Sequence, residues 1–295
     1  MKVLNIGSLN IDYVYEVEHH VLSKETISST SLNVFAGGKG LNQSIALAKA
    51  NATVCHAGKL GEEGQFLLDT LNQHQVDTRY VQMVKEKSGH AIIQLDPKGE
   101  NCILLHGGAN QMLDVAFIDE VLSNFDEKDI LILQNETNML KEIIDKACDK
   151  KMTIVLNPSP FNEKIKRCNL EKVDYFLLNE VEGMQMCETE NEDEIIKKLK
   201  DRFPKAKFVL TLGEKGAIYV DETQIVHQEI FEVKAIDTTA AGDTFTGYFI
   251  AGLVEGLAVK DNLKRCAKAS SMCVSRNGAA ASIPKLDEVC RQMNK

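Results

Sequence analysis

Short apolar runs alternate with segments of helical hydrophobic periodicity through most of this 295-residue chain, and this alternation limits the folds it can adopt. Strands that alternate with helices form a parallel sheet whose two faces are covered by those helices. The predicted strands are residues 3–6, 53–57, 129–133, 152–156, 175–178 and 208–212, and the predicted helices are residues 63–74, 114–123, 138–149 and 192–202. We therefore predict a doubly wound, mostly parallel α/β sheet covered by helices on both faces.

Two further segments have a different character. Residues 13–36 alternate weakly and are rich in Thr, Ser and Val, and the turn Asp96-Pro-Lys-Gly99 separates two β-like runs. Both are expected to form strands outside the main sheet, the second as a hairpin. Because the chain has no Pro/Gly/Ser-rich linker, repeat or low-complexity tract, we expect one domain over residues 1–295.

Charge and composition exclude several classes of protein. A formal charge of −9 argues against a non-specific nucleic-acid binder. No apolar run is long enough to span a membrane, and the first residues do not resemble a signal peptide. The eight cysteines are scattered without a Cys-x-x-Cys pair, which indicates free thiols in a reducing cytoplasm rather than disulfides or a zinc site.

Residues 237–249 carry the clearest chemical signal. Small residues, Ala240-Ala241-Gly242, directly precede Asp243 and an apolar run that begins at Phe245, which is typical of a loop entering a helix. Free N–H groups at a helix start attract anions, and a carboxylate beside them can take a proton from a hydroxyl that attacks a phosphate. An acid that only stabilises its own helix explains the same residues, so this stretch alone leaves both interpretations open.

A glycine loop, Gly37-Gly38-Lys39-Gly40, opens a second helix. It is neither a Walker A loop nor a dinucleotide fingerprint. Glycines allow a ligand to approach the backbone, and Lys39 and Asn42 would face that ligand from the helix start. The alternative is a flexible turn with a solvated lysine.

Polar residues also follow predicted strands. Asn10 and Asp12 come after the first strand, and Glu136 comes three residues after the 129–133 strand. Open α/β sheets bind ligands at the carboxyl ends of their strands. Asn10 and Asp12 are equally explained as turn formers.

Two of these stretches resemble the signatures of the ribokinase-like sugar kinases, the PfkB family. Residues 35–43 are similar to the first signature and residues 237–245 to the second, and the likeness runs in family order from Gly7 to Pro284. The resemblance implies a ribokinase-like fold with a small β lid, built from segments about 13–36 and 88–106, over the sugar. It also implies an ATP-dependent carbohydrate kinase, with D-ribose to D-ribose 5-phosphate as the first expectation.

The resemblance further implies roles for individual residues. Asp243 is the implied catalytic base, with the N–H groups of Ala241, Gly242 and Asp243 holding the developing phosphate charge. The implied sugar-binding residues are Asn10, Asp12, Gly38, Lys39, Asn42, Glu136 and Asp243. The implied ATP-binding residues are Asn179, Thr211, Gly213, Gly216 and Gly242.

Metal ions and a second subunit are also expected. Asn179 and Glu182 match an Asn-x-x-Glu motif, and Glu182 is implied to hold Mg²⁺ through water, as hard oxygen ligands do. The resemblance implies an activating K⁺ held mainly by backbone carbonyls at Asp237, Thr239, Cys273, Arg276, Gly278 and Ser282. Unpaired strand edges in two small β-rich segments favour a homodimer through the lids.

The chain departs from the family pattern at two places. Ser23-Lys24 stands where ribokinase-like chains usually carry Pro-Gly, which leaves the turn and the lid hinge uncertain, and Ala267 stands where an Asn often lies near the adenine. Two alternatives to a ribose kinase remain. One is a kinase of fructose, a deoxysugar or a nucleoside, and the other is a catalytically silent sugar-binding regulator, against which Asp243 and the Asn179/Glu182 pair argue.

Overall fold

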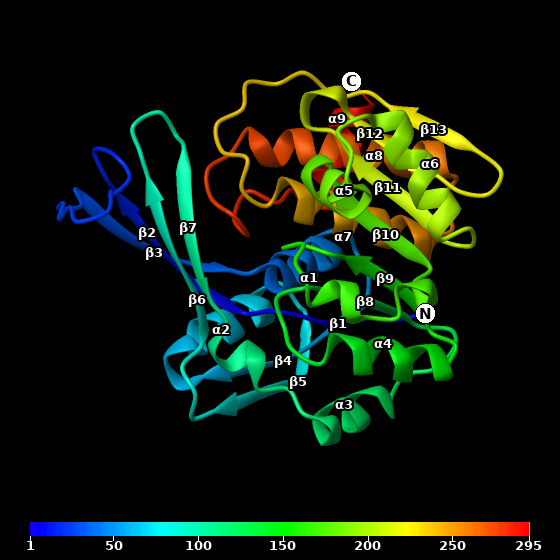
Figure 1. The fold of residues 1–295 in the computed structure, drawn as a ribbon, viewed down its shortest axis with the longest axis horizontal. Helices are drawn as coiled ribbons and strands as arrows, with labels where there is room; N and C mark the ends of the chain where they lie inside the picture. The colour runs from blue at the N-terminus through cyan, green and yellow to red at the C-terminus, as the bar shows by residue number, and fades with distance from the viewer. Residues whose placement is uncertain (295) are drawn as a thin grey trace.

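The main sheet of the computed structural model, which describes residues 1–294, has nine strands in the order β13-β12-β11-β10-β9-β8-β1-β4-β5 (Figure 1). Neighbouring strands from β5 to β11 run parallel, and β12 and β13 add an antiparallel edge. The strands are β1 Val3–Ile6, β4 Val54–Gly61, β5 Asp77–Val84, β8 Ile130–Gln134, β9 Thr153–Asn157, β10 Tyr175–Asn179, β11 Lys207–Thr211, β12 Ala217–Val220 and β13 Ile225–Gln228.

Helices cover both faces of this sheet. One buried cluster joins the sheet to α3 Val115–Leu122, α4 Leu140–Asp149, α5 Glu180–Cys187 and α6 Glu192–Arg202. The other joins it to α1 Lys39–Lys49, α2 Gln65–Gln73, α7 Ala241–Glu255, α8 Val259–Val274 and α9 Leu286–Met293. Successive strand residues point to opposite faces, so Val3 enters the second cluster while Leu4 enters the first. The predicted doubly wound fold is confirmed.

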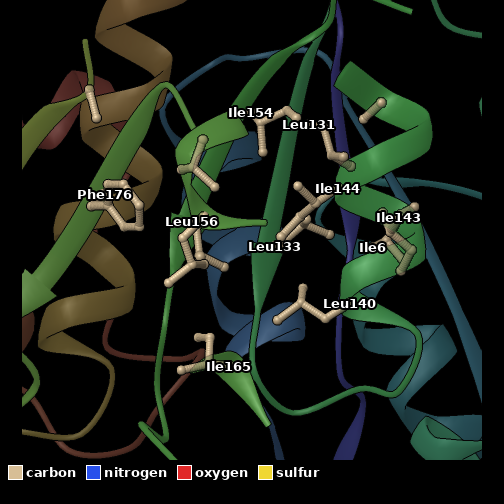
Figure 2. Close-up of a cluster of buried hydrophobic side chains, with 14 of the residues drawn as sticks. Ile6, Leu131, Leu133, Leu140, Ile143, Ile144, Ile154, Leu156, Ile165 and Phe176 are labelled. Carbon is tan, nitrogen blue, oxygen red and sulfur yellow. The ribbon is translucent and has the colours of Figure 1, made fainter. Parts of the chain in front are cut away.

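The first cluster fixes the central strands against α4. Leu133 of β8 and Ile144 of α4 lie side by side in Figure 2, near Ile6 of β1, and all three are fully buried. Burying one large aliphatic side chain contributes roughly 1.5–3 kcal/mol. The carboxyl ends of β1 and β8 are therefore held firmly relative to each other, and the chain segments that follow them start from fixed positions.

A second sheet of four strands, in the order β3-β2-β6-β7, stands away from the main body in Figure 1. Its strands are β2 Asn10–Glu16, β3 Ser31–Gly37, β6 Gly89–Leu95 and β7 Asn101–His106, and we call it the small sheet. The expected hairpin forms between β6 and β7, with the turn at residues 96–100. Residues 17–30, which were expected to contribute to strands, lie outside any strand.

Several features differ from the sequence-based expectations. Strand β5, helix α5 and the antiparallel edge of β12 and β13 were not predicted, and β4 runs to Gly61 although only residues 53–57 were expected. Ser23 and Lys24 do form a turn, closed by the N–H of Glu25 on the carbonyl of Leu22 at 3.1 Å, with Lys24 in the left-handed region at φ 71°. No helix among residues 1–294 has the length and apolar composition that crossing a membrane requires.

Candidate active site

Close packing of α1 and α7 builds the centre of the site. A Cβ on Gly247 of α7 would lie 2.4 Å from the Cβ of Ala46 in α1, so only glycine permits this approach. The approach brings Asp243, in the first turn of α7, against the start of α1. There its carboxylate accepts hydrogen bonds from Nδ2 of Asn42 at 3.1 Å and from Nε2 of Gln43 at 2.9 Å. Asp243 is 8% exposed, so both of its oxygens are fixed within the protein.

The first turn of α7 presents free backbone donors beside this carboxylate. Ala240 takes a left-handed conformation at φ 61° before the helix starts. The N–H of Ala241 donates to the carbonyl of Thr238 at 3.3 Å, so one of the three expected donors is already engaged. Within residues 1–294, the N–H groups of Gly242 and Asp243 have no protein acceptor. Two adjacent free donors at the start of a long helix favour an anion there.

Asn10 and Asp12 reach the site from strand β2 rather than from the turn that was considered for them. Asn110 fixes Asn10 by donating from Nδ2 to its Oδ1 at 2.7 Å. Asp12 packs over Gly37, where a Cβ would lie 1.9 Å from Oδ2 of Asp12. Burial, followed by the negative charges of Glu136 and Asp243, raises the pKa of Asp12 to about 7. Besides burial, the raised pKa reflects the closeness of three carboxylates, those of Asp12, Glu136 and Asp243.

Glu136 and Lys39 are two side chains of opposite charge in this region. The carboxylate of Glu136 accepts from the hydroxyl of Ser8 and from the N–H of Lys39. Burial raises the pKa of Glu136 above its ordinary value, although the charge of Lys39 opposes this. For Lys39, burial lowers the pKa, but the charges of Asp243, Glu136 and Glu182 outweigh it and the net shift is upward. Lys39 therefore stays protonated among these carboxylates.

One buried acceptor in the site has no partner. Oδ1 of Asn42 is fully buried and accepts no hydrogen bond within residues 1–294, while its Nδ2 is committed to Asp243. A buried polar atom without a partner costs roughly 1–3 kcal/mol, so such atoms are usually satisfied by a ligand or by water. Asn42 fits a ligand that brings a hydroxyl donor close to Asp243.

A cavity of about 360 Å³ lies beside the first turn of α7, where Ala241, Gly242 and Phe245 line it. Its lining includes Thr211, Gly213, Gly216 and Gly242, four of the residues expected to bind ATP. Its remaining walls come largely from Ile230, Phe231, Val233, Ala235, Ala267 and Val274, and the loop residues among them were not predicted from the sequence. Apolar walls with free helix-start donors at one end suit a flat aromatic group carrying phosphates.

A smaller cavity of about 50 Å³ adjoins this one, because Thr211, Gly242 and Phe245 line both. Its lining also includes Asn179, Glu182, Lys39 and Asp243. Asn179 and Glu182 also form the capping box of α5, in which each side chain accepts from the other's backbone N–H. The motif therefore has a structural role in addition to the expected one.

The residues expected around K⁺ also come together, apart from one side chain. The carboxylate of Asp237 accepts from the N–H of Thr239 and from the N–H of Gly278, both at 2.9 Å. Sγ of Cys273 lies 3.0 Å from Oγ of Ser282 and 3.7 Å from the carbonyl oxygen of Thr239. Partial burial would raise the pKa of Asp237, but the hydrogen bonds from Thr239 and Gly278 hold it below its ordinary value.

Two cationic side chains hold the loop that follows α8. The guanidinium of Arg276 pairs with the carboxylate of Glu288 in α9 at 3.0 Å. Nζ of Lys49 donates to the carbonyls of Ala280 and Ile283 at 3.0 and 2.7 Å. The loop is thereby tied to α1, whose other end carries Lys39 and Asn42.

Sequence reasoning missed three side chains that the structure places directly behind the site. Ser8 contacts Glu136, Gln43 contacts Asp243, and Asn110 contacts Asn10. Gln43 lies inside the first signature, residues 35–43, and Ser8 lies two residues before Asn10, so the signal was available. Asn110 lies in a separate 3₁₀ turn, residues 108–111, that carries no recognisable motif.

Residues 1–286 match the family model described as pfkB family carbohydrate kinase. The chain belongs to the pfkB family of carbohydrate kinases. It is similar to a ribokinase of Staphylococcus aureus, with 32% identity over 98% of both chains, and to a deoxyribokinase of Salmonella typhi, with 28% identity over 98% of this chain and 97% of the relative. The solved structure of Arabidopsis thaliana ribokinase with ribose and ATP matches with a TM-score of 0.87 at 27% identity, covering 100% of this chain and 99% of that one. This pfkB family member is an ATP-dependent carbohydrate kinase.

Proposed function

We propose that this kinase transfers the γ-phosphate of ATP to the 5-hydroxyl of D-ribose. The proposal rests on one observation. Asn10, Asp12 and Glu136 lie close to Asp243, which is in the first turn of the helix that offers two free N–H donors. Such a site offers many hydrogen-bonding groups to a polyhydroxyl ligand. A ribokinase of S. aureus is a relative at 32% identity, which supports the choice of sugar.

The proposed chemistry follows from positions and charges. Asp243 takes the proton from the attacking hydroxyl, and the N–H groups of Gly242 and Asp243 stabilise charge on the transferred phosphoryl group. Asn42 orients Asp243 through the hydrogen bond from Nδ2. Lys39 adds a positive charge between the sugar-side acids and the phosphate side. Holding the reactants in this order is most of what phosphoryl transfer requires.

Asn179, Thr211, Gly213, Gly216 and Gly242 bind the nucleotide in this proposal, along the two joined cavities. Glu182 fits a Mg²⁺ held through water, since it is a nearly buried carboxylate that lines the smaller cavity. When bound, Mg²⁺ neutralises charge on the phosphates.

The loop around Asp237 fits a monovalent cation, since it brings together the carboxylate of Asp237, the carbonyl of Thr239 and the hydroxyl of Ser282 next to the start of α7. A cation that orders this loop would order the neighbouring N–H donors. Turnover should therefore rise when K⁺ is added over a Na⁺ background. Equal turnover in K⁺ and in a large organic cation would contradict this role.

The small sheet, with segments 13–36 and 88–106, acts in this proposal as a lid and as a dimer interface. Leu32, Val34, Ile103 and Leu104 are exposed on it, and exposed apolar strands gain from being covered. Light scattering at assay concentration tests this, and a monomer there would contradict it. The eight unpaired cysteines support a reducing, cytoplasmic location.

A kinase of 2-deoxyribose is the second candidate, favoured by the similarity to a Salmonella deoxyribokinase. A coupled ADP-release assay with ribose, 2-deoxyribose, fructose and nucleosides separates these substrates. We expect ribose to give the highest kcat/KM. A higher value for another acceptor would replace the sugar, and no ADP release with any acceptor would reject the kinase proposal and favour a silent sugar-binding protein.

A further inference from the structure

A chain of buried amides lies directly behind Asp243. Gln43, Gln134 and Asn5 are all fully buried, and they connect Asp243 in α7 to strands β1 and β8 and to helix α1. Nε2 of Gln43 donates to Oδ1 of Asp243 at 2.9 Å, and Oε1 of Gln43 accepts from Nε2 of Gln134 at 2.7 Å. None of these three amides binds the sugar or the nucleotide in the proposed function. Buried polar networks are costly unless they are satisfied, so this one calls for an explanation.

The direction of each hydrogen bond between these buried amides follows from one backbone carbonyl. The carbonyl of Gly40 can only accept, so the group of Asn5 that lies 2.8 Å from it must be the NH₂. Oδ1 of Asn5 then faces Gln134, which must donate to it at 3.0 Å. The same Nε2 of Gln134 donates to Oε1 of Gln43, and this leaves the NH₂ of Gln43 facing Asp243.

A second carbonyl gives the same answer from the opposite side. The carbonyl of Leu177 accepts from Nδ2 of Asn157 at 2.8 Å, so Oδ1 of Asn157 must point the other way. There it faces Nε2 of Gln43 at 3.4 Å. Two independent carbonyls, one in helix α1 and one in strand β10, therefore fix the same orientation of the Gln43 amide.

We propose that Gln43 is a positioning residue for the proposed base Asp243, and that Gln134 acts through Gln43 by fixing which end of its amide faces the carboxylate. A flipped Gln43 would turn its oxygen toward the Asp243 carboxylate, and two acceptors would then repel. In the observed orientation the NH₂ of Gln43 instead holds Oδ1 of Asp243 at 2.9 Å. This inference rests on the proposed role of Asp243.

Two apolar substitutions of similar shape test the chain. Gln43→Met removes the hydrogen bond to Asp243, and Gln134→Met leaves that bond possible but removes what orients it. In Gln43→Met, kcat should fall by about tenfold to a hundredfold, since small misplacements of catalytic groups have effects of this size. Gln134→Met should lower kcat by a smaller factor, with the KM for the sugar nearly unchanged in both variants.

Asn262→Leu is the matched control. Asn262 is an equally buried amide, whose Nδ2 donates to the carbonyl of Phe249 at 2.8 Å between α7 and α8, away from the carboxylate. This variant should lower the melting temperature without lowering kcat. If Gln43→Met and Gln134→Met also leave kcat unchanged, the amides have a structural role only and the proposal is wrong.

A second measurement separates this inference from the proposed function. A crystal structure of each variant shows where the Asp243 carboxylate lies without any turnover. A carboxylate displaced from its wild-type position in Gln43→Met supports the positioning role even if the sugar assignment fails. A carboxylate that stays in place overturns the positioning role even if the wild type phosphorylates ribose. If Gln43→Met does not fold, Gln134→Met decides by the same two readouts.

Discussion

Two regions contribute to the same site in opposite ways. One is the junction between α1 and α7, and the other is the small sheet. At the junction, Gln43 is fully buried and Asn42 is 5% exposed, and each has a defined hydrogen-bond partner. On the small sheet, Ile103 is 55% exposed and Leu104 67% exposed, without a covering layer. The junction can hold a carboxylate in one geometry because every neighbour is packed. The small sheet has far fewer packed neighbours and is suited to move.

Asp12 and Asn10 lie where the two regions meet. They belong to β2 of the small sheet, yet Asn110 and Gly37 hold them next to the junction. A movement of the small sheet would therefore move two proposed sugar-binding side chains relative to Asp243. We infer that catalysis depends on the junction between α1 and α7. Sugar selection depends on Asn10 and Asp12, at the boundary between the two regions.

The largest expected effect is at the junction. Asp243→Asn should lower turnover by about two to four orders of magnitude, because the amide cannot accept the hydroxyl proton. This is the usual contribution of a general base to the rate. Binding of ribose and of ATP, measured by calorimetry, should remain. Near-wild-type turnover would remove Asp243 from the chemistry and leave the buried junction without a catalytic purpose.

The next effect is at the boundary and concerns substrate choice. Removing one hydrogen bond to a charged group costs about 1.5–3 kcal/mol, so 2-deoxyribose should lose about tenfold to a hundredfold in kcat/KM relative to ribose. Competition kinetics measure this ratio. Asp12→Ala should abolish most of the discrimination and also impair ribose itself.

Glu136→Ala sharpens the same distinction. Glu136 is on the sugar side, so ribose binding should weaken while the dissociation constant for ATP stays nearly unchanged. Equal losses for both ligands would show that the two sides of the site cannot be separated in this way.

A smaller effect follows from the pKa of Asp12, which burial and neighbouring acids raise to about 7. Because the folded protein favours the protonated form of Asp12, the resulting contribution to the free energy of unfolding is complete below 3.8, the ordinary pKa of aspartate. It is lost as the pH rises through about 7. The ionised form is the better acceptor for sugar hydroxyls, so ribose should bind several-fold more tightly at pH 8 than at pH 6. Asp12→Asn should remove that pH dependence, and calorimetry at the two pH values checks it.

The smallest effects concern one strained residue in each region. Lys24, beside the small sheet, and Ala240, before α7, both have positive φ values, of 71° and 61°. Replacing either by glycine should raise the free energy of unfolding by no more than about 1 kcal/mol. Only Ala240→Gly should also change kcat, since Ala240 sets the first turn that carries the N–H donors. A change in kcat for Lys24→Gly would contradict the proposed separation of the regions.

The sequence predicted the parts of the molecule that depend on local pattern. The alternation of apolar runs with helical periodicity is a local signal, and it located β8 to β11 to within a few residues. It could not show the antiparallel β12 and β13, because edge strands are short and their pairing depends on distant neighbours. It also could not show that Asn10 and Asp12 lie in a strand, because β2 is held by partners from residues 31–37 and 89–95.

The site was predictable only as far as the motifs extended. Asp243 and Lys39 carry their signals in short stretches that open helices. Gln134 carries none, because its role depends on contacts with residues 91 and 129 positions away. The donor of Ala241 was counted as free because the bond to Thr238 is a property of backbone geometry, which side-chain identity does not determine.

The central claim is that Asp243 activates the 5-hydroxyl of ribose. The most direct test is to incubate the protein with ribose labelled with carbon-13 at the fifth position, ATP, Mg²⁺ and K⁺, and to record phosphorus and carbon NMR spectra. The account predicts a new phosphorus–carbon coupling at that position in the wild type and almost none over the same time in Asp243→Asn. Phosphate on another hydroxyl, or equal product from both proteins, would contradict it.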